Sequence, residues 1–145
     1  MMPFKVVHAE ADHDAALPVE RAALAAVGAE LVCAGTTDPQ TLITMAHDAD
    51  ILLTEVMPIT RQILEGLSRC QAVVCYAIGL DHIDLHAATE HGILVAHTPG
   101  FCAEEVSNHT ILFMLACARR LLPLDRGVRA GTWPAGRNLE VALLP

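Results

Sequence analysis

The sequence predicts an α/β fold, an open parallel sheet of about five strands with flanking helices and one long C-terminal helix. Short apolar runs rich in β-branched residues alternate with longer segments of helical spacing, a rhythm typical of βαβ units. The runs are largely continuous in apolar character, as in strands that helices cover on both faces. With 145 residues, 53% of them hydrophobic, the chain suits one core rather than two full domains.

The expected elements follow this rhythm along the chain. The strands are expected at Phe4–Ala9, Glu30–Ala34, Ile51–Thr54, Ala72–Ala77 and Ile93–His97. The helices between them are expected at Pro18–Val27, Pro39–Ala46, Thr60–Ser68 and His82–His91. Pro18 and Pro39 suit a first helical turn, and Gly28 and Gly92 suit the position just past a helix end.

A last long helix is expected at 103–122. Its acidic start at 104–105 and its two arginines at 119–120 complement the helix dipole. Apolar residues lie on both of its sides, so more than one side should be buried. A second domain or a partner subunit would provide that cover; alternatively, the segment after Arg126 folds back over the helix.

Composition excludes several classes of protein. The 17 acidic and 9 basic residues give a net charge of -8, which with a single Trp argues against nucleic-acid binding. Apolar runs fall short of the ~20 residues of a membrane span, and no signal peptide precedes them, which predicts a cytoplasmic protein. The five cysteines form no CxxC pair, so a reducing compartment is expected and a thiolate zinc site is not.

The turn after the fourth strand, 76–84, is the first candidate site. Ligands of open parallel sheets lie beyond the carboxyl ends of the strands. Gly79 would let the backbone approach a small anion, with the amides of Ile78 and Gly79 free to donate. Asp81 and Asp84 resemble a cap and a first-turn acid of the next helix. The alternative is an ordinary turn that needs its glycine for φ alone.

Two further turns face the same edge of the sheet. They follow the fifth and third strands, at 97–102 and 55–60, and complete a three-sided pocket. For Glu55 and Met57 the alternative is a helix-entry loop with an incidental acid.

Three histidines raise further possibilities. His82 and His86, four apart beside Asp81, could be drawn as a metal site, but they lack a third ligand and an exposed helical face explains them better, so no metal is expected. His109 in the long helix has no evident partner for acid–base work and is interpreted as buried or facing another domain.

Five motifs in register resemble one family. They are 50–54 with 58–61, Tyr76-Ala-Ile-Gly-Leu-Asp-His-Ile-Asp84, Ala87-Ala-Thr-Glu-His-Gly-Ile93, Pro99-Gly-Phe-Cys-Ala-Glu-Glu-Val-Ser-Asn-His-Thr110 and 118–120 with 129–133. In order and spacing this is similar to the N-terminal portion of the D-isomer-specific 2-hydroxyacid dehydrogenases. The resemblance runs from about residue 48 to 133, whereas the N-terminal third agrees only in its βα rhythm.

The resemblance implies a domain plan and a set of binding residues. Residues 1–101 would form a flavodoxin-like substrate-binding domain, 102–125 an interdomain crossover helix, and 126–145 a linker toward an NAD-binding domain that this sequence does not contain. The family's carboxylate-holding amides would fall on Ala77, Ile78 and Gly79, its substrate loop on Glu55, Val56 and Met57, and its contact to the nicotinamide end of NAD or NADP on Val106.

The sequence also departs from the family. It has no GxGxxG turn, and the family's catalytic arginine, glutamate and histidine belong to the NAD-binding domain, so no catalytic residue is assigned here. Asn108 replaces a common acid, and Glu55 would put a negative charge near an anionic substrate. The expected function is therefore the binding of a small 2-keto or 2-hydroxy acid within an NAD(P)-dependent oxidoreductase, with no turnover by this chain alone.

Two other functions stay open. The chain could be a non-catalytic flavodoxin-like binding or dimerisation module, with a homodimer through the long helix. It could also be a receiver or FMN carrier, although the acidic segment 9–14 suits a phosphate poorly.

Overall fold

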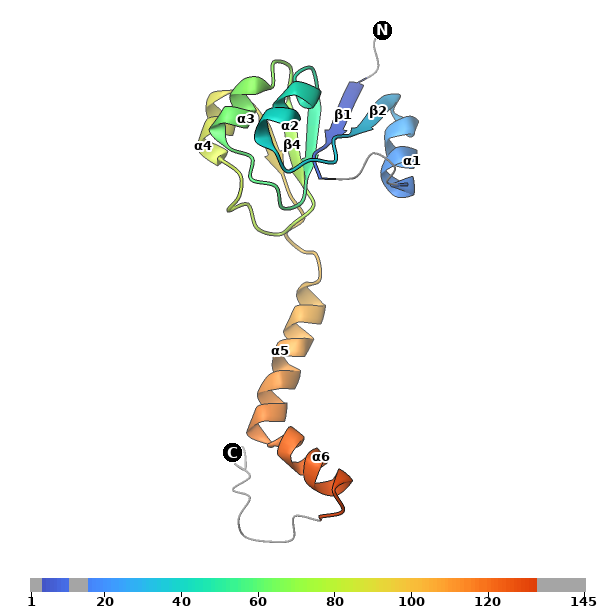
Figure 1. Ribbon diagram of the computed structural model, residues 1–145, viewed down its shortest axis with the longest axis vertical. Helices are drawn as coiled ribbons and strands as arrows, with labels where there is room; N and C mark the ends of the chain where they lie inside the picture. Colours follow the sequence, from blue (N-terminus) through green and yellow to red (C-terminus); the bar gives the residue numbers. More distant parts are fainter. Residues whose placement is uncertain (1–3, 11–15, 133–145) are drawn as a thin grey trace. The chain divides into compact units, whose positions relative to one another are not determined.

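The computed structural model describes residues 4–10 and 16–132, and the chain divides into two compact units between Phe101 and Cys102. In the first unit, five parallel strands form one sheet in the order β2-β1-β3-β4-β5, which confirms the predicted fold class (Figure 1). The strands are β1 Phe4–His8, β2 Ala29–Cys33, β3 Ile51–Thr54, β4 Ala72–Cys75 and β5 Leu94–Ala96. The helices of this unit are α1 Pro18–Ala26, α2 Pro39–Ala46, α3 Arg61–Gly66 and α4 Leu85–Glu90.

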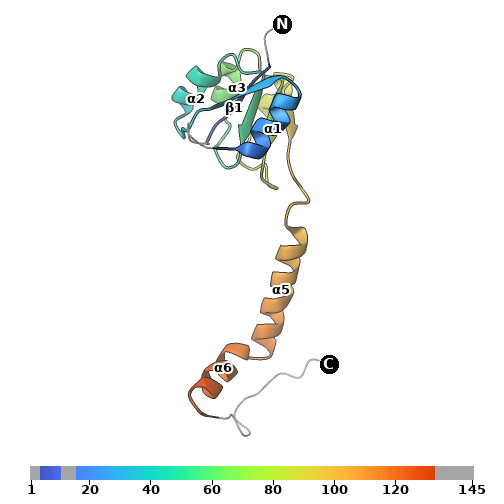
Figure 2. The ribbon, with the colours of Figure 1, turned by 90° about the vertical axis from the view of Figure 1, so that its right-hand side faces the viewer.

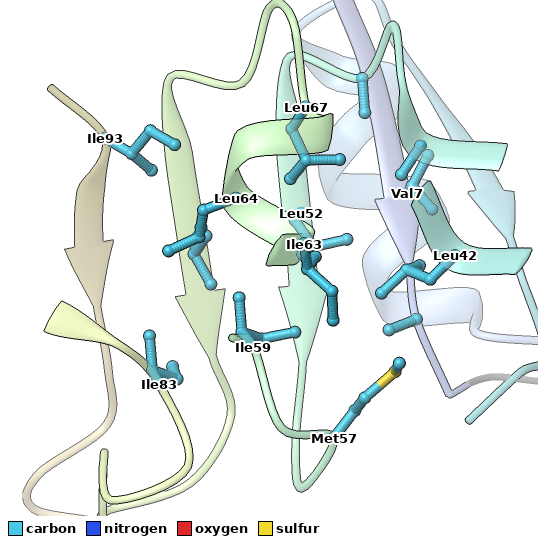
Figure 3. Packing of buried hydrophobic residues seen from close by; sticks show 14 of the residues in the cluster. Val7, Leu42, Leu52, Met57, Ile59, Ile63, Leu64, Leu67, Ile83 and Ile93 are labelled. Atoms are coloured by element: carbon cyan, nitrogen blue, oxygen red, sulfur yellow. The ribbon is translucent and has the colours of Figure 1, made fainter. Parts of the chain in front are cut away.

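The core of the first unit lies between the sheet and the row α2, α3 and α4. Leu42 of α2 and Ile63 and Leu64 of α3 meet Leu52 and Val73 of the central strands, all within 1% of complete burial (Figure 3). Burial of each such side chain stabilises the fold by about 1.5–3 kcal/mol. This core fixes the register of the strands, and hence where each strand ends.

The other face of the sheet is less covered. Successive residues of a strand point to opposite faces, so Leu52 enters the core whereas Leu53 faces α1. Helix α1 lies against the sheet (Figure 2), where it contacts β2. No residue of α1 is buried. An open groove of about 730 Å³ runs along α1, lined by Leu24, Leu53, Tyr76 and Phe101 among others.

The second unit contains two helices where the sequence predicts one. Helix α5, Ala103–Ala118, ends before Arg120, whose φ of 52° is left-handed, and α6 runs from Leu121 to Arg129. Pro123 explains the break, because in a continuous helix its ring would clash with the carbonyl four residues earlier. In the first turn of α6 the same proline is tolerated, because no hydrogen bond from its nitrogen is needed there. The helix therefore also extends into the predicted linker, as far as Arg129.

Apolar side chains of the second unit lie open. Of the described residues of α5 and α6 none is buried, and Leu112, Phe113 and Leu122 are each more than half exposed. Among the helices described, none is both long and apolar enough to cross a membrane.

Candidate functional site

Loops at the carboxyl edge of the sheet form the candidate site. The loops after β3 and β4 are joined by a parallel bridge between Ile59 and Ile83. The Ile59 amide donates to the His82 carbonyl at 2.8 Å, and the Asp84 amide donates to the Ile59 carbonyl at 2.9 Å. The two loops therefore hold each other in place.

The loop after β4 presents two open backbone amides. Strand β4 ends at Cys75, two residues before the predicted end, and releases the following residues into the loop. Ile78 and Gly79 are exposed, and in the part of the chain that the structure describes their N–H groups have no acceptor. The Ala77 N–H, also predicted to bind the anion, instead donates to the Cys75 sulfur at 3.4 Å.

Gly79 has little room for a side chain and does not adopt a left-handed backbone angle. It is not among the described glycines with positive φ, which removes the φ-only explanation of this turn. A Cβ at this position would lie 3.2 Å from Oδ2 of Asp81, a tight contact. A larger residue would therefore push against the Asp81 carboxylate.

Cys75 and His82 lie beneath this loop. The fully buried Cys75 sulfur is 3.8 Å from the Gly79 carbonyl oxygen, 3.9 Å from that of Glu55 and 3.7 Å from His82 Nε2. His82 precedes α4, so the predicted helical pair with His86 does not form.

Asp84 caps α4. Its side chain accepts a hydrogen bond from the Ala87 amide at 2.8 Å, as expected of an N-cap. Asp81, the other acid predicted near this helix start, lies outside the helix. Among the residues described, no group of three potential ligands could hold a metal ion.

The loop after β3 is occupied by a carboxylate of the chain itself. Oε1 of Glu10, which follows β1, accepts hydrogen bonds from the amides of Glu55 at 3.0 Å, Val56 at 2.9 Å and Met57 at 2.6 Å. It also accepts one from the Thr54 hydroxyl at 2.8 Å. The backbone donors of this loop are therefore already satisfied, and the open donors at this edge are those of the β4 loop.

The environment of Glu10 favours its ionised form. Burial raises the pKa of the Glu10 carboxyl, but the hydrogen bonds from Met57, Thr54, Val56 and Glu55 outweigh burial, and the pKa lies below its ordinary value. The second oxygen, Oε2, is buried 3.8 Å from Nδ1 of His8, without a hydrogen-bond partner in the described part of the chain.

The predicted substrate-loop side chains differ in accessibility. Glu55 is exposed and Val56 is 69% exposed, so both can face a ligand. Met57 is 2% exposed and packs in the core, where it cannot line an open pocket (Figure 3).

Two predicted residues belong to the second unit. Val106 lies in α5 and is 59% exposed. His109 is exposed rather than buried, and its ring meets Phe113 edge to face, with the centroids 4.5 Å apart.

The chain is similar to known proteins in sequence and fold. Residues 11–140 match the family model of the D-isomer specific 2-hydroxyacid dehydrogenase catalytic domain. A glyoxylate reductase of Korarchaeum cryptofilum is 36% identical over 93 residues, which is 63% of this chain and 28% of that protein. The chain thus spans between a quarter and a third of that relative's length.

Two solved structures are also similar. A putative D-isomer specific 2-hydroxyacid dehydrogenase from Polaromonas is 26% identical at a TM-score of 0.63, covering 96% of this chain and 44% of that one. D-lactate dehydrogenase from Aquifex aeolicus, complexed with NAD and lactic acid, shares the fold at 23% identity and a TM-score of 0.74, over 96% of this chain and 40% of that one. Because the family model covers most of the sequence, this chain belongs to the D-isomer-specific 2-hydroxyacid dehydrogenases, as their catalytic domain.

Proposed function

We propose that this chain binds the carboxylate of a small 2-keto or 2-hydroxy acid within an NAD(P)-dependent D-2-hydroxyacid dehydrogenase. The observation that carries the proposal is that the amides of two exposed residues at the carboxyl edge of the sheet, Ile78 and Gly79, have no acceptor among the described residues. Adjacent backbone amides can hold an anion without a cationic side chain. Glyoxylate, the substrate that the name of the Korarchaeum relative indicates, carries such a carboxylate.

The expected affinity is modest. Two charge-assisted hydrogen bonds contribute about 1.5–3 kcal/mol each before the cost of immobilising the ligand. A dissociation constant of 1 mM corresponds to a standard free energy of binding of about −4.1 kcal/mol. The chain should therefore bind glyoxylate in the millimolar range.

Nuclear magnetic resonance tests this binding directly. In the ¹⁵N-labelled chain, the amide signals of Ile78 and Gly79 should move when glyoxylate is added. Glycolaldehyde, which lacks the carboxylate, is the matched control and should leave them in place. Equal shifts with both compounds, or none with glyoxylate at tens of millimolar, would count against the proposal.

The described residues do not by themselves fit a dinucleotide. Helix α5, which carries Val106, has Glu104 and Glu105 in its first turn, and their charges would oppose a pyrophosphate there. When bound to the enzyme, the cofactor supplies hydride; this chain contributes substrate orientation. We expect the 145 residues alone not to oxidise NADH in the presence of glyoxylate, as followed by absorbance.

A homodimer through α5 stays a prediction. The observation that favours the homodimer is that α5 exposes apolar side chains, Leu112 and Phe113 among them. Light scattering should give a molecular mass near 31 kDa, twice the 15.5 kDa of one chain, whereas a monomeric mass would contradict the dimer.

A further inference from the structure

The direction of the two open amides depends on the carbonyl groups behind them. The Gly79 N–H shares one peptide unit with the Ile78 carbonyl, and the Ile78 N–H shares one with the Ala77 carbonyl. A trans peptide is planar, so its N–H and its C=O point in opposite directions. Whatever holds these two carbonyls therefore aims both donors.

Residues after β5 hold both carbonyls. Nδ1 of His97 lies 2.8 Å from the Ile78 oxygen. The Thr98 amide and hydroxyl each lie 3.3 Å from the Ala77 oxygen, and the hydroxyl also lies 3.0 Å from that of Tyr76. Because a carbonyl only accepts, Nδ1 of His97 carries the proton in this contact.

We propose that His97 and Thr98 are positioning residues for the anion-binding amides. The proposal rests on the proposed function. Neither residue needs to contact the ligand. Each acts through its hydrogen bond to the carbonyl of a peptide unit whose N–H would bind the anion. A hydrogen bond accepted at the carbonyl also polarises the peptide and strengthens its N–H as a donor.

Loss of this grip should weaken binding rather than folding. His97 is exposed. The peptide unit whose carbonyl it contacts joins Ile78 to Gly79, and glycine allows that unit to rotate widely. A rotated peptide would turn the Ile78 oxygen toward the anion in place of an N–H. The loss of one charge-assisted donor corresponds to a dissociation constant that is at least about tenfold weaker.

Substitutions on the labelled 145-residue chain test the proposal through the affinity for glyoxylate. His97→Ala should weaken binding at least about tenfold. His97→Asn should restore it, because the Asn amide nitrogen, like Nδ1, is two bonds from Cβ. His91→Ala is the matched control, since His91 is an exposed histidine before β5, at the opposite edge of the sheet, and its affinity should equal that of the wild type.

Thr98 offers a second, independent pair of variants. Thr98→Val removes only the hydroxyl and should weaken binding, whereas Thr98→Ser keeps the hydroxyl and should not. Long-range ¹H–¹⁵N spectra of the wild type should also show His97 as the Nδ1–H tautomer.

Each outcome decides between the ideas. If the wild type binds glyoxylate and His97→Ala binds equally well, the positioning role is overturned while the proposed function stands. If His97→Ala weakens binding and His97→Asn does not restore it, the hydrogen bond from residue 97 to the Ile78 carbonyl does not explain the loss. The positioning role of His97 is then overturned too. If the wild-type amides of Ile78 and Gly79 do not respond to glyoxylate, the proposed function fails, and the positioning role fails with it.

Discussion

Glu10→Ala should be the most damaging single substitution at the carboxyl edge of the sheet. The change removes the oxygen that accepts hydrogen bonds from three successive amides and from the Thr54 hydroxyl. The amides of exposed Glu55 and Val56 can turn to water instead. Thr54 and Met57 are 0% and 2% exposed. Without Glu10 the Met57 amide has no acceptor among the described residues, and the Thr54 hydroxyl keeps only a long contact of 3.5 Å to the Met57 carbonyl.

The magnitude follows from those two buried donors. Each unsatisfied buried donor costs about 1–3 kcal/mol. Part of this is returned, because the variant no longer buries Oε2 of Glu10 without a hydrogen bond. We therefore expect a loss of about 2–4 kcal/mol in the free energy of unfolding. Glu10→Gln keeps the accepting oxygen but not its charge and should lose about half as much.

Urea unfolding followed by circular dichroism measures this loss. With a slope of about 2 kcal/mol per molar urea, Glu10→Ala should lower the midpoint by about 1–2 M. Glu55→Ala is the control, because Glu55 is an exposed acid of the same loop, and it should stay within about 0.5 kcal/mol of the wild type. A Glu10→Ala midpoint equal to that of the control would refute the role given to the Glu10 carboxylate.

Three other predictions concern the same unit. The Glu10 pKa lies below its ordinary value of 4.5, so the charge of Glu10 stabilises the fold above that pH and ceases to do so as the pH falls through the folded-state pKa. In that acidic range the difference in unfolding free energy between the wild type and Glu10→Gln, measured in urea, should become smaller. A difference that stays constant with pH would contradict this. Asp84→Ala removes the cap bond to the Ala87 amide and should cost about 1 kcal/mol in thermal or urea unfolding; no loss would show that the cap is dispensable. Gly66→Ala would place a Cβ 2.6 Å from a methyl carbon of Ile43 and should lower the free energy of unfolding by about 1–3 kcal/mol. Added to Ile43→Ala, the same change should cost nothing relative to Ile43→Ala alone. An undiminished loss in that background would place the strain elsewhere.

The sheet was predictable because each strand is mostly apolar and short. β3, predicted and observed as Ile51–Thr54, is the clearest case. Other ends shifted by one or more residues: α4 begins at Leu85 rather than His82, because Asp84 supplies the cap. The break between α5 and α6 also had a signal in the sequence, Pro123, which the charge pattern of a single long helix obscured.

The candidate site was only partly predictable. The exposed amides of Ile78 and Gly79 follow from a glycine after a parallel strand, and the structure places them at the expected edge. The role of Glu10 could not be deduced, because its partners lie 44–47 residues away in the sequence and hydrogen bonds to backbone amides leave no residue-type pattern. The one available signal was an acid directly after an apolar strand.

The two loops suggest why an anion would select one of two sets of amides at the same edge. Three amides after β3 face a carboxylate that the chain itself provides, and its charge opposes a second anion there. The two amides after β4 have no such acceptor among the described residues. The carbonyl groups of the same two peptide units are hydrogen-bonded to His97 and Thr98. Under the proposed function, an incoming carboxylate would be disfavoured at the first loop and would find oriented donors at the second. Glu10 would then help to determine which loop binds the proposed substrate, without touching that substrate.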